Sequence, residues 1–218
     1  MRNESMHPDD GNRESDSWLE AALIRVVNHH RHDWMNDLQV LLGYIQLNKP
    51  DRLRAYIDEL QDKLYRESLV AKLGDQTLIA FLFTFRADDH PLTLTVRPVR
   101  DINLLLCKEG GADASAAMIA AILAYCASAR LGAAGGNELA VSLDLIMNQA
   151  GWYDLVMAFE YTGDYDPTVL KDKLQDVIKR YQEHPHRNAE CEFQDSAVDL
   201  ELRQRWTGMD EVMDNVLR

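Results

Sequence analysis

Cysteine is scarce in this sequence. Cys107, Cys126 and Cys191 are its three cysteines, an odd number, and no two of them are close in the chain. The absence of any CxxC pair gives no sign of a structural zinc site or a redox centre. We therefore expect free, buried thiols, which suit the reducing cytoplasm.

Basic residues are also in short supply. Lys and Arg total 23 against 36 Asp and Glu, so the formal net charge is −13. Nucleic-acid binding needs basic patches that neutralise phosphates, and docking on anionic membranes needs them as well. The balance argues against both and leaves other proteins as partners.

Long apolar runs are absent too. No stretch approaches the ~18 apolar residues of a membrane span. The first 17 residues, "MRNESMHPDDGNRESDS", lack the basic start and apolar core of a signal peptide. We predict a disordered arm at residues 1–17, no membrane association and a cytoplasmic location.

What the sequence does contain is a helical pattern over residues 18–74, which we expect to form one domain, a helical hairpin. Apolar side chains recur at spacings of three and four along residues 18–48. "NKPD" interrupts the pattern, and Pro50 is well placed to open a second helix. "GD" at residues 74 and 75 ends that helix. The apolar positions of the first helix are Leu19, Leu23, Val26, Val27, His30, Trp34, Leu38, Leu41 and Ile45.

Such a hairpin is hard to stabilise alone. Each apolar stripe of two antiparallel helices has only one neighbour, and the rest of it stays in contact with water. Two hairpins packed together form a four-helix bundle that buries both stripes. We therefore predict a homodimer; the alternative is that the hairpin folds back onto its own C-terminal domain.

Residues 75–218 change character and form the second expected domain. Helical segments and strands with alternating apolar residues are mixed there, which predicts an α+β fold with antiparallel strands and helices on one face of a sheet. The expected elements are helices at 76–87, 113–132 and 166–181, a strand at 91–99, strand pairs within 137–161 and 189–206, and a last short helix at 208–218.

The stretch "NHHRHDWMNDLQ" at residues 28–39 places three histidines close together. At 100° per residue, His30 falls within the apolar stripe and is expected to be a core or interface histidine. His32 falls about 180° from Leu23, opposite the stripe. Arg25, Asn36 and Gln39 share that outward ridge, so His32 is expected to be exposed and accessible to a large partner.

The residues alone leave three interpretations of these histidines open. His29 and His32 are three positions apart, which suits two metal ligands, but there is no HExxH motif and no nearby cysteine. Asp33 points off the ridge, so we expect no metal site. A merely solvated histidine cluster and a reactive histidine both remain.

A family resemblance favours the reactive histidine. "RHDWMNDLQVLLGYIQLNKPDRLRAYIDEL", residues 31–60, resembles the helical hairpin of the sporulation initiation phosphotransferase B family. It is similar, more distantly, to the hairpin of sensor histidine kinases of the citrate and fumarate sensor type. The likeness extends through residues 78–85, 92–99 and 137–145. The shared pattern His-Asp-aromatic-x-Asn-x-Leu-Gln is matched by His32, Asp33, Trp34, Asn36, Leu38 and Gln39.

The resemblance implies that His32 accepts a phosphoryl group and assigns no such role to His29 or His30. Neutral imidazole is a good nucleophile near pH 7, and its outward position suits transfer to a second protein. Asn36 is expected to fix the ring or to bind phosphoryl oxygens, and Asp33 to orient the imidazole. Arg25 and Gln39 are expected to face the partner, with Arg25 offsetting phosphate charge.

The C-terminal domain resembles a histidine-kinase ATP domain, an α/β sandwich, without its ATP motifs. Kinases of this kind carry an Asn-rich helix, a DxGxG segment and a Gly-rich lid. Residues 113–131 contain no Asn, DxGxG is absent, and the glycine cluster "LGAAGGNE" leads into a strand rather than opening a helix.

We therefore predict a phosphorelay phosphotransferase that controls sporulation initiation. It would take a phosphoryl group from the aspartate of a single-domain response regulator and pass it to that of a transcription-factor regulator. No cofactor of its own is expected, because the regulators would supply Mg²⁺. A divergent ATP-dependent histidine kinase and a non-catalytic regulator-binding module are the alternatives.

Overall fold

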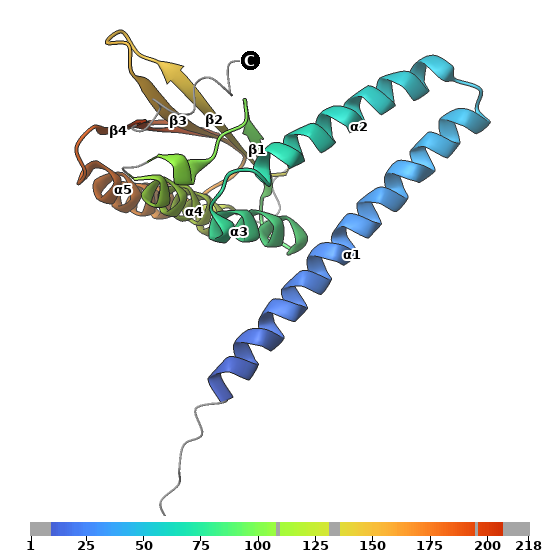
Figure 1. The fold of residues 1–218 in the computed structure, drawn as a ribbon, viewed down its shortest axis with the longest axis horizontal. Helices are drawn as coiled ribbons and strands as arrows, with labels where there is room; N and C mark the ends of the chain where they lie inside the picture. The colour runs from blue at the N-terminus through green and yellow to red at the C-terminus, as the bar shows by residue number, and fades with distance from the viewer. Residues whose placement is uncertain (1–9, 108–109, 131–135, 195, 207–218) are drawn as a thin grey trace, which may run out of the picture.

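The structure, a computed structural model, describes residues 10–107, 110–130, 136–194 and 196–206, with side chains from residue 20 onward. A long helical hairpin projects from one side of an α/β domain (Figure 1). The predicted hairpin and the predicted α+β domain are both present. The short helix predicted at 208–218 and the glycine predicted to end a helix, Gly132, lie outside the described residues.

The hairpin consists of α1 (Asp10–Gln46) and α2 (Pro50–Val70). Pro50 occupies the first turn of α2, where a missing backbone N–H costs nothing. Asn48 adopts a left-handed conformation with φ of 52°, which Asn tolerates better than most residues. The turn predicted from "NKPD" is therefore confirmed.

The start of α1 differs from the prediction of an arm over residues 1–17. Residues 10–17 are helical, and residues 1–9 of the predicted arm lie outside the described part of the chain. The sequence has no proline between Asp10 and the hairpin turn to stop the helix, and the carboxylate of Asp10 suits a helix N-terminus. The prediction of disorder is therefore wrong for residues 10–17, where a polar composition occurs within a helix.

The two hairpin helices meet along a polar seam formed by Asp33, Asp37, Tyr56 and Lys63. The Tyr56 hydroxyl donates to Asp37 Oδ1 at 2.7 Å. Lys63 Nζ lies 3.5 Å from Asp37 Oδ2 and 3.8 Å from Asp33 Oδ2. Much of the predicted apolar stripe of α1 stays exposed within the single chain, namely Leu23, Val27, Trp34, Leu38 and Ile45, whereas Val26, His30 and Leu41 are partly buried.

Five strands form one mixed sheet in the order β1-β2-β3-β5-β4. β1 and β2 run parallel, which corrects the expectation of antiparallel strands only. The long connection between them contains α4, and such a crossover returns the chain in the same direction. The elements of this domain are α3 (Gln76–Ala87), β1 (Thr93–Pro98), η1 (Leu104–Leu106), α4 (Gly111–Ser128), β2 (Glu138–Met147), β3 (Tyr153–Thr162), α5 (Pro167–Gln182), β4 (Arg187–Phe193) and β5 (Ala197–Arg205).

The helices cover one face of this sheet, as predicted (Figure 1). Burial alternates along β5, where Val198, Leu200 and Leu202 are buried and their neighbours are only partly so. The same alternation in β2 and β3 places the core between the sheet and α3, α4 and α5. Among the described residues no helix covers the other face of the sheet.

Helix α3 joins the hairpin to the domain. Its N-terminus is capped by Asp75, whose carboxylate accepts from the backbone N–H groups of Thr77 and Leu78. The ring of Phe83 lies 5.9 Å from that of His30 on α1. Arg86 donates to Glu67 of α2 at 3.1 Å, so both hairpin helices are held by α3.

Helix α4 also corrects the expectation that no stretch resembles a membrane span. It has 18 residues and a mean hydropathy of 1.4, enough to cross a membrane by length and composition alone. Half of this stretch is buried inside the domain, and its apolar character follows from that packing. A core helix of a globular domain has the same composition.

Candidate functional site

His32 is exposed on α1, as the helical geometry predicted. Asn36, one turn further along the same helix, places its amide Nδ2 3.2 Å from His32 Nδ1. Residues four apart on a helix lie one above the other, so the backbone alone brings the two side chains together. The contact engages Nδ1, and the described residues offer Nε2 no hydrogen bond.

The orientation of the Asn36 amide decides which ring nitrogen can react. With Nδ2 donating to Nδ1, the proton of neutral imidazole sits on Nε2, and the free nitrogen has no lone pair for attack. With the amide turned by half a revolution, its oxygen accepts from Nδ1–H, and Nε2 carries the lone pair. The structure has the first arrangement, with Asn36 Nδ2 facing His32 Nδ1, and the second requires the amide to turn by half a revolution.

Asp33 turns away from His32. Its Oδ2 lies 3.7 Å from His29 Nε2 and 3.8 Å from Lys63 Nζ. The carboxylate therefore belongs to the polar seam between the hairpin helices. The predicted orienting role of Asp33 on the imidazole of His32 has no contact to support it among the described residues.

Arg25 and Gln39, the other residues of the predicted ridge, make no described contact with His32. Arg25 Nε donates to Asp88 Oδ1 at 2.9 Å, which ties α1 to the segment after α3. Its charge is therefore already paired, although both side chains are more than a third exposed. Gln39 is exposed on the ridge.

His29 and His30, the other two histidines of the stretch at residues 28–39, contact residues other than Asn36. His30 packs against Phe83, which supports the prediction of a core or interface histidine. His29 faces Asp33. Within the described part of the chain, no group of three or more His, Cys, Asp or Glu side chains is arranged to hold a metal ion.

Sequence reasoning missed the seam residues Asp37, Tyr56 and Lys63. The hydrogen bond to Asp37 raises the pKa of Tyr56 to about 12, because the neutral phenol donates to a carboxylate. The other carboxylate oxygen of Asp37 is buried without a hydrogen bond. The sequence shows part of this seam, because Asp33 and Asp37 lie four residues apart on one side of α1. It does not show that α2 faces them.

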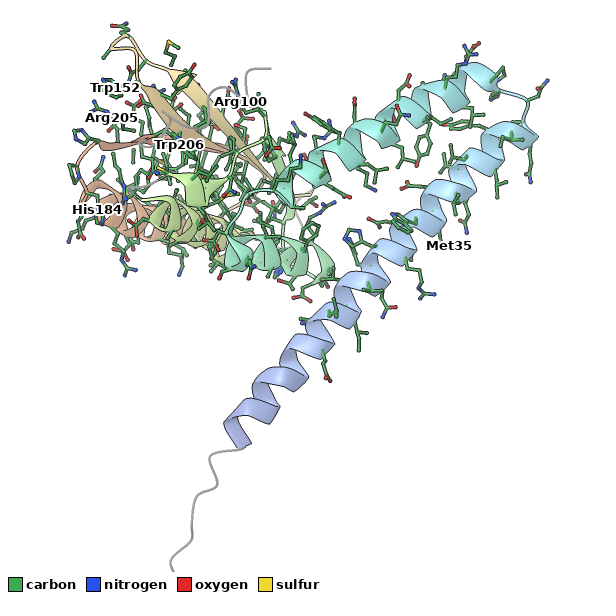
Figure 2. All side chains as sticks on the ribbon, viewed as in Figure 1. Met35, Arg100, Trp152, His184, Arg205 and Trp206 are labelled. Atoms are coloured by element: carbon green, nitrogen blue, oxygen red, sulfur yellow. The ribbon has the colours of Figure 1, made fainter. Side chains whose placement is uncertain are left out.

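The exposed apolar side chains of α1 form a second surface beside the ridge. Trp34 is 63% exposed and Leu38 is 53% exposed. Met35 projects from α1 into solvent (Figure 2). Large apolar side chains gathered on one helix face mark an interaction surface. The other members of this surface are Leu23, Ile24, Val27, Leu42 and Ile45.

The hairpin that displays His32 is the part of the chain that matches a family model. Residues 15–73 match the family model of the SpoOB-type sensor kinase alpha-helical domain, and this segment contains His32 and the whole polar seam. A stretch of 88 residues is 35% identical to sporulation initiation phosphotransferase B of Bacillus subtilis (strain 168). The resemblance seen in the motif is thereby confirmed. The match covers 40% of this chain and 46% of that relative, so the chain spans about half the length of the relative it matches.

Solved structures similar to the whole chain are histidine kinases. Histidine kinase AdeS of Acinetobacter baumannii is 14% identical, with 81% of this chain and 98% of that chain covered and a TM-score of 0.42. Histidine kinase ThkA, in complex with response regulator protein TrrA, is 14% identical, with 96% and 70% covered and a TM-score of 0.40. TM-scores this low assign neither an activity nor a partner to this chain.

Proposed function

We propose that this protein is a phosphorelay phosphotransferase that carries a phosphoryl group on His32. The observation that carries the proposal is the exposed imidazole of His32, held at Nδ1 by Asn36, within a segment that matches a phosphotransfer hairpin family. An exposed nucleophile with one nitrogen held suits transfer to and from another protein. A rigid helix supplies the positioning that such a transfer needs.

The transfer step requires a lone pair on Nε2. With the Asn36 oxygen accepting from Nδ1–H, Nε2 attacks the phosphorus of an aspartyl phosphate in line. The N–P bond forms as the O–P bond to the aspartate breaks, and the freed carboxylate keeps the electron pair. The Nδ1 proton stays on the ring, still donated to Asn36, and the reverse step delivers the group to a second aspartate.

The partners in this proposal are two response regulators, a single-domain donor and a transcription-factor acceptor, in a cytoplasmic pathway that controls sporulation initiation. The 35% identity to sporulation initiation phosphotransferase B supports this choice. The regulators would supply Mg²⁺ and the acidic pocket around the reacting aspartate. This chain would supply the nucleophile, its tautomer and the docking surface.

In this proposal the protein acts as a homodimer. The apolar surface of α1 is exposed in the single chain, and α2 adds Leu64 and Tyr65, which are 46% and 61% exposed. A second hairpin packed against the first would bury this surface in a four-helix bundle. The ridge that carries His32 lies beside this surface on α1, and the proposed bundle leaves it accessible.

The test is label transfer from a radiolabelled, phosphorylated single-domain response regulator of the same genome. We expect the wild type and His29→Ala to acquire label and His32→Ala to acquire none. His29 is the matched control, because it lies one turn away on the same helix and pairs with Asp33. Labelling of His32→Ala would contradict the proposal, and so would a wild type that acquires no label.

A further inference from the structure

Cationic side chains gather at the end of the α/β domain that faces away from the hairpin. His184 and His186 lie in the loop between α5 and β4, and Arg187 opens β4. Arg203 and Arg205 lie at the end of β5, which pairs with β4. In a chain with a net charge of −13, this cluster places three arginines beside the carboxylates of Asp113, Asp154 and Glu201. Nothing in the phosphotransfer role proposed for the hairpin uses it.

Two small hollows open among these side chains. One measures about 260 Å³ and the other about 280 Å³. His186, Arg187 and Arg205 line both. Each is smaller than the 300–1,000 Å³ typical of sites for drug-sized ligands, so each suits a small ion or a short organic molecule.

Two of the three arginines are already engaged. Arg187 is 7% exposed and donates to Asp113 at 2.8 Å, with its guanidinium 5.3 Å from the centre of the Tyr181 ring. This hydrogen bond holds the pKa of Asp113 below its usual range. Arg203 pairs with Glu201 at 2.9 Å. Both are fixed in place by partners within the chain.

Arg205 has no such carboxylate. Its guanidinium lies 5.4 Å from the centre of the Trp152 ring, and the described residues offer it no ion pair. Trp152, Arg205 and His184 lie along the same outer end of the domain (Figure 2). A cation stacked on an aromatic ring keeps its edge N–H groups available for an anion.

The loop beside Arg205 is held in an unusual conformation. His186 has φ of 65°, in the left-handed region, and its carbonyl accepts from the backbone N–H of Arg205 at 3.1 Å. His184 Nε2 lies 4.0 Å from Asp113 Oδ2. Strain of this kind persists only where the surroundings enforce it, and it concentrates at ligand sites.

The acidic side chains that line the hollows are occupied. Asp113 is paired with Arg187, and Asp154 accepts from the Asn148 amide at 3.2 Å through both oxygens. Both carboxylates keep their negative charge, and Asp154 lies opposite Arg205 in the β3–β5 pairing, so an anion would have to bind on Arg205 and His186 beside them.

We propose that this end of the domain binds a small phosphate-bearing anion, with Arg205 and His186 as the principal donors. A guanidinium donates two parallel N–H groups to phosphate oxygens, and an imidazole N–H adds a third. Gly110, at the N-terminus of α4, lines one hollow, and the Arg187 guanidinium occupies the space where a side chain of this residue would lie. The site is remote from His32 and distinct from the proposed phosphotransfer.

The experiment is isothermal titration of the full-length protein with inorganic phosphate and with glycerol 3-phosphate, at constant ionic strength set by chloride. We expect saturable binding, and Arg205→Gln and His186→Asn each to weaken it by about tenfold or more. Asn tolerates the left-handed conformation, so His186→Asn keeps the loop. Arg97→Gln is the matched control, because Arg97 is exposed on β1 at the other edge of the sheet.

Three results would overturn the proposal: no saturable binding at millimolar phosphate, equal affinity in Arg205→Gln and the wild type, or equal loss in Arg97→Gln. Loss of phosphate binding in His32→Ala would also overturn it, by moving the site to the hairpin. Retained phosphate binding in a His32→Ala variant that accepts no label is the expected pattern. That pattern separates this site from the phosphotransfer proposal.

Discussion

Removing the Tyr56 hydroxyl tests how the hairpin is held together. In Tyr56→Phe, Asp37 Oδ1 loses a 2.7 Å hydrogen bond, and its other oxygen is already buried without one. Lys63, at 3.5 Å, remains as the nearest cation. Hydrogen bonds to charged groups contribute about 1.5–3 kcal/mol, so we expect the free energy of unfolding to fall by about 2 kcal/mol.

The assay is urea unfolding at fixed protein concentration, because association would make the midpoint depend on concentration. The matched control is Tyr65→Phe, since Tyr65 is on the same helix and 61% exposed. We expect its free energy of unfolding to change by less than about 0.5 kcal/mol. Equal effects of the two substitutions would refute the assignment of the seam.

The same pair gives a pH dependence with a definite sign. The pKa of Tyr56 is raised from its ordinary 10.0 to about 12, so the folded state keeps its phenol proton longer than the unfolded state does. The stabilisation is complete below pH ~10 and is lost as the pH rises towards ~12. The difference between wild type and Tyr56→Phe should therefore shrink over that interval and stay constant between pH ~7 and ~9.

Three further predictions follow from other contacts. Asn36→Leu should slow phosphoryl acceptance by about tenfold in rapid-quench measurements, because it removes the contact with the His32 ring. The unfolding midpoint should not change, because no buried group is lost. An unchanged rate would refute the tautomer argument. Trp34→Glu should convert the proposed dimer to a monomer in light scattering, because it places a charge on the proposed interface, where Trp34 is 63% exposed in the single chain. A dimer of unchanged affinity would place the interface elsewhere. Gly110→Ala should destabilise the fold by about 1–3 kcal/mol, because φ is 96° and a Cβ would collide with the Arg187 guanidinium. The control is Gly136→Ala, where φ is 80° but the space around the residue is open. It should lower the free energy of unfolding by about 1 kcal/mol in the same urea assay.

Most of the fold could be predicted from local signals. Pro50 and the Asp166–Pro167 pair each begin a helix where the sequence indicated, because proline fixes φ and an aspartate caps the free N–H groups. The strand pair within 137–161 followed from alternation around a turn that begins at Asn148. Signals of this kind lie within a few residues of one another, so the sequence contains them directly.

Long-range pairing could not be predicted in the same way. Nothing local to β1 shows that it pairs with β2 in parallel, because the partner lies beyond a helix. The contact of α3 with α1 through His30 and Phe83 joins residues more than fifty positions apart. The side of α1 that meets α2 is likewise set by contacts between the two helices, such as that of Asp37 with Tyr56, so the polar seam escaped prediction.

In the candidate site, too, local features could be predicted and long-range contacts could not. The exposure of His32 and its contact with Asn36 follow from helical periodicity alone. Asp33 and Arg25 were assigned to the site because they neighbour His32 in the sequence or share its face. Each instead pairs with a partner from another element, Lys63 and Asp88 respectively.

The source of the phosphoryl group on His32 tests the central claim most directly. The protein would be incubated either with radiolabelled ATP and Mg²⁺ or with a labelled, phosphorylated single-domain response regulator, and the label would be mapped by peptide mass spectrometry. A phosphotransferase acquires label on His32 from the regulator and none from ATP. Label from ATP would identify a kinase, and label on any residue other than His32 would contradict the account of the site.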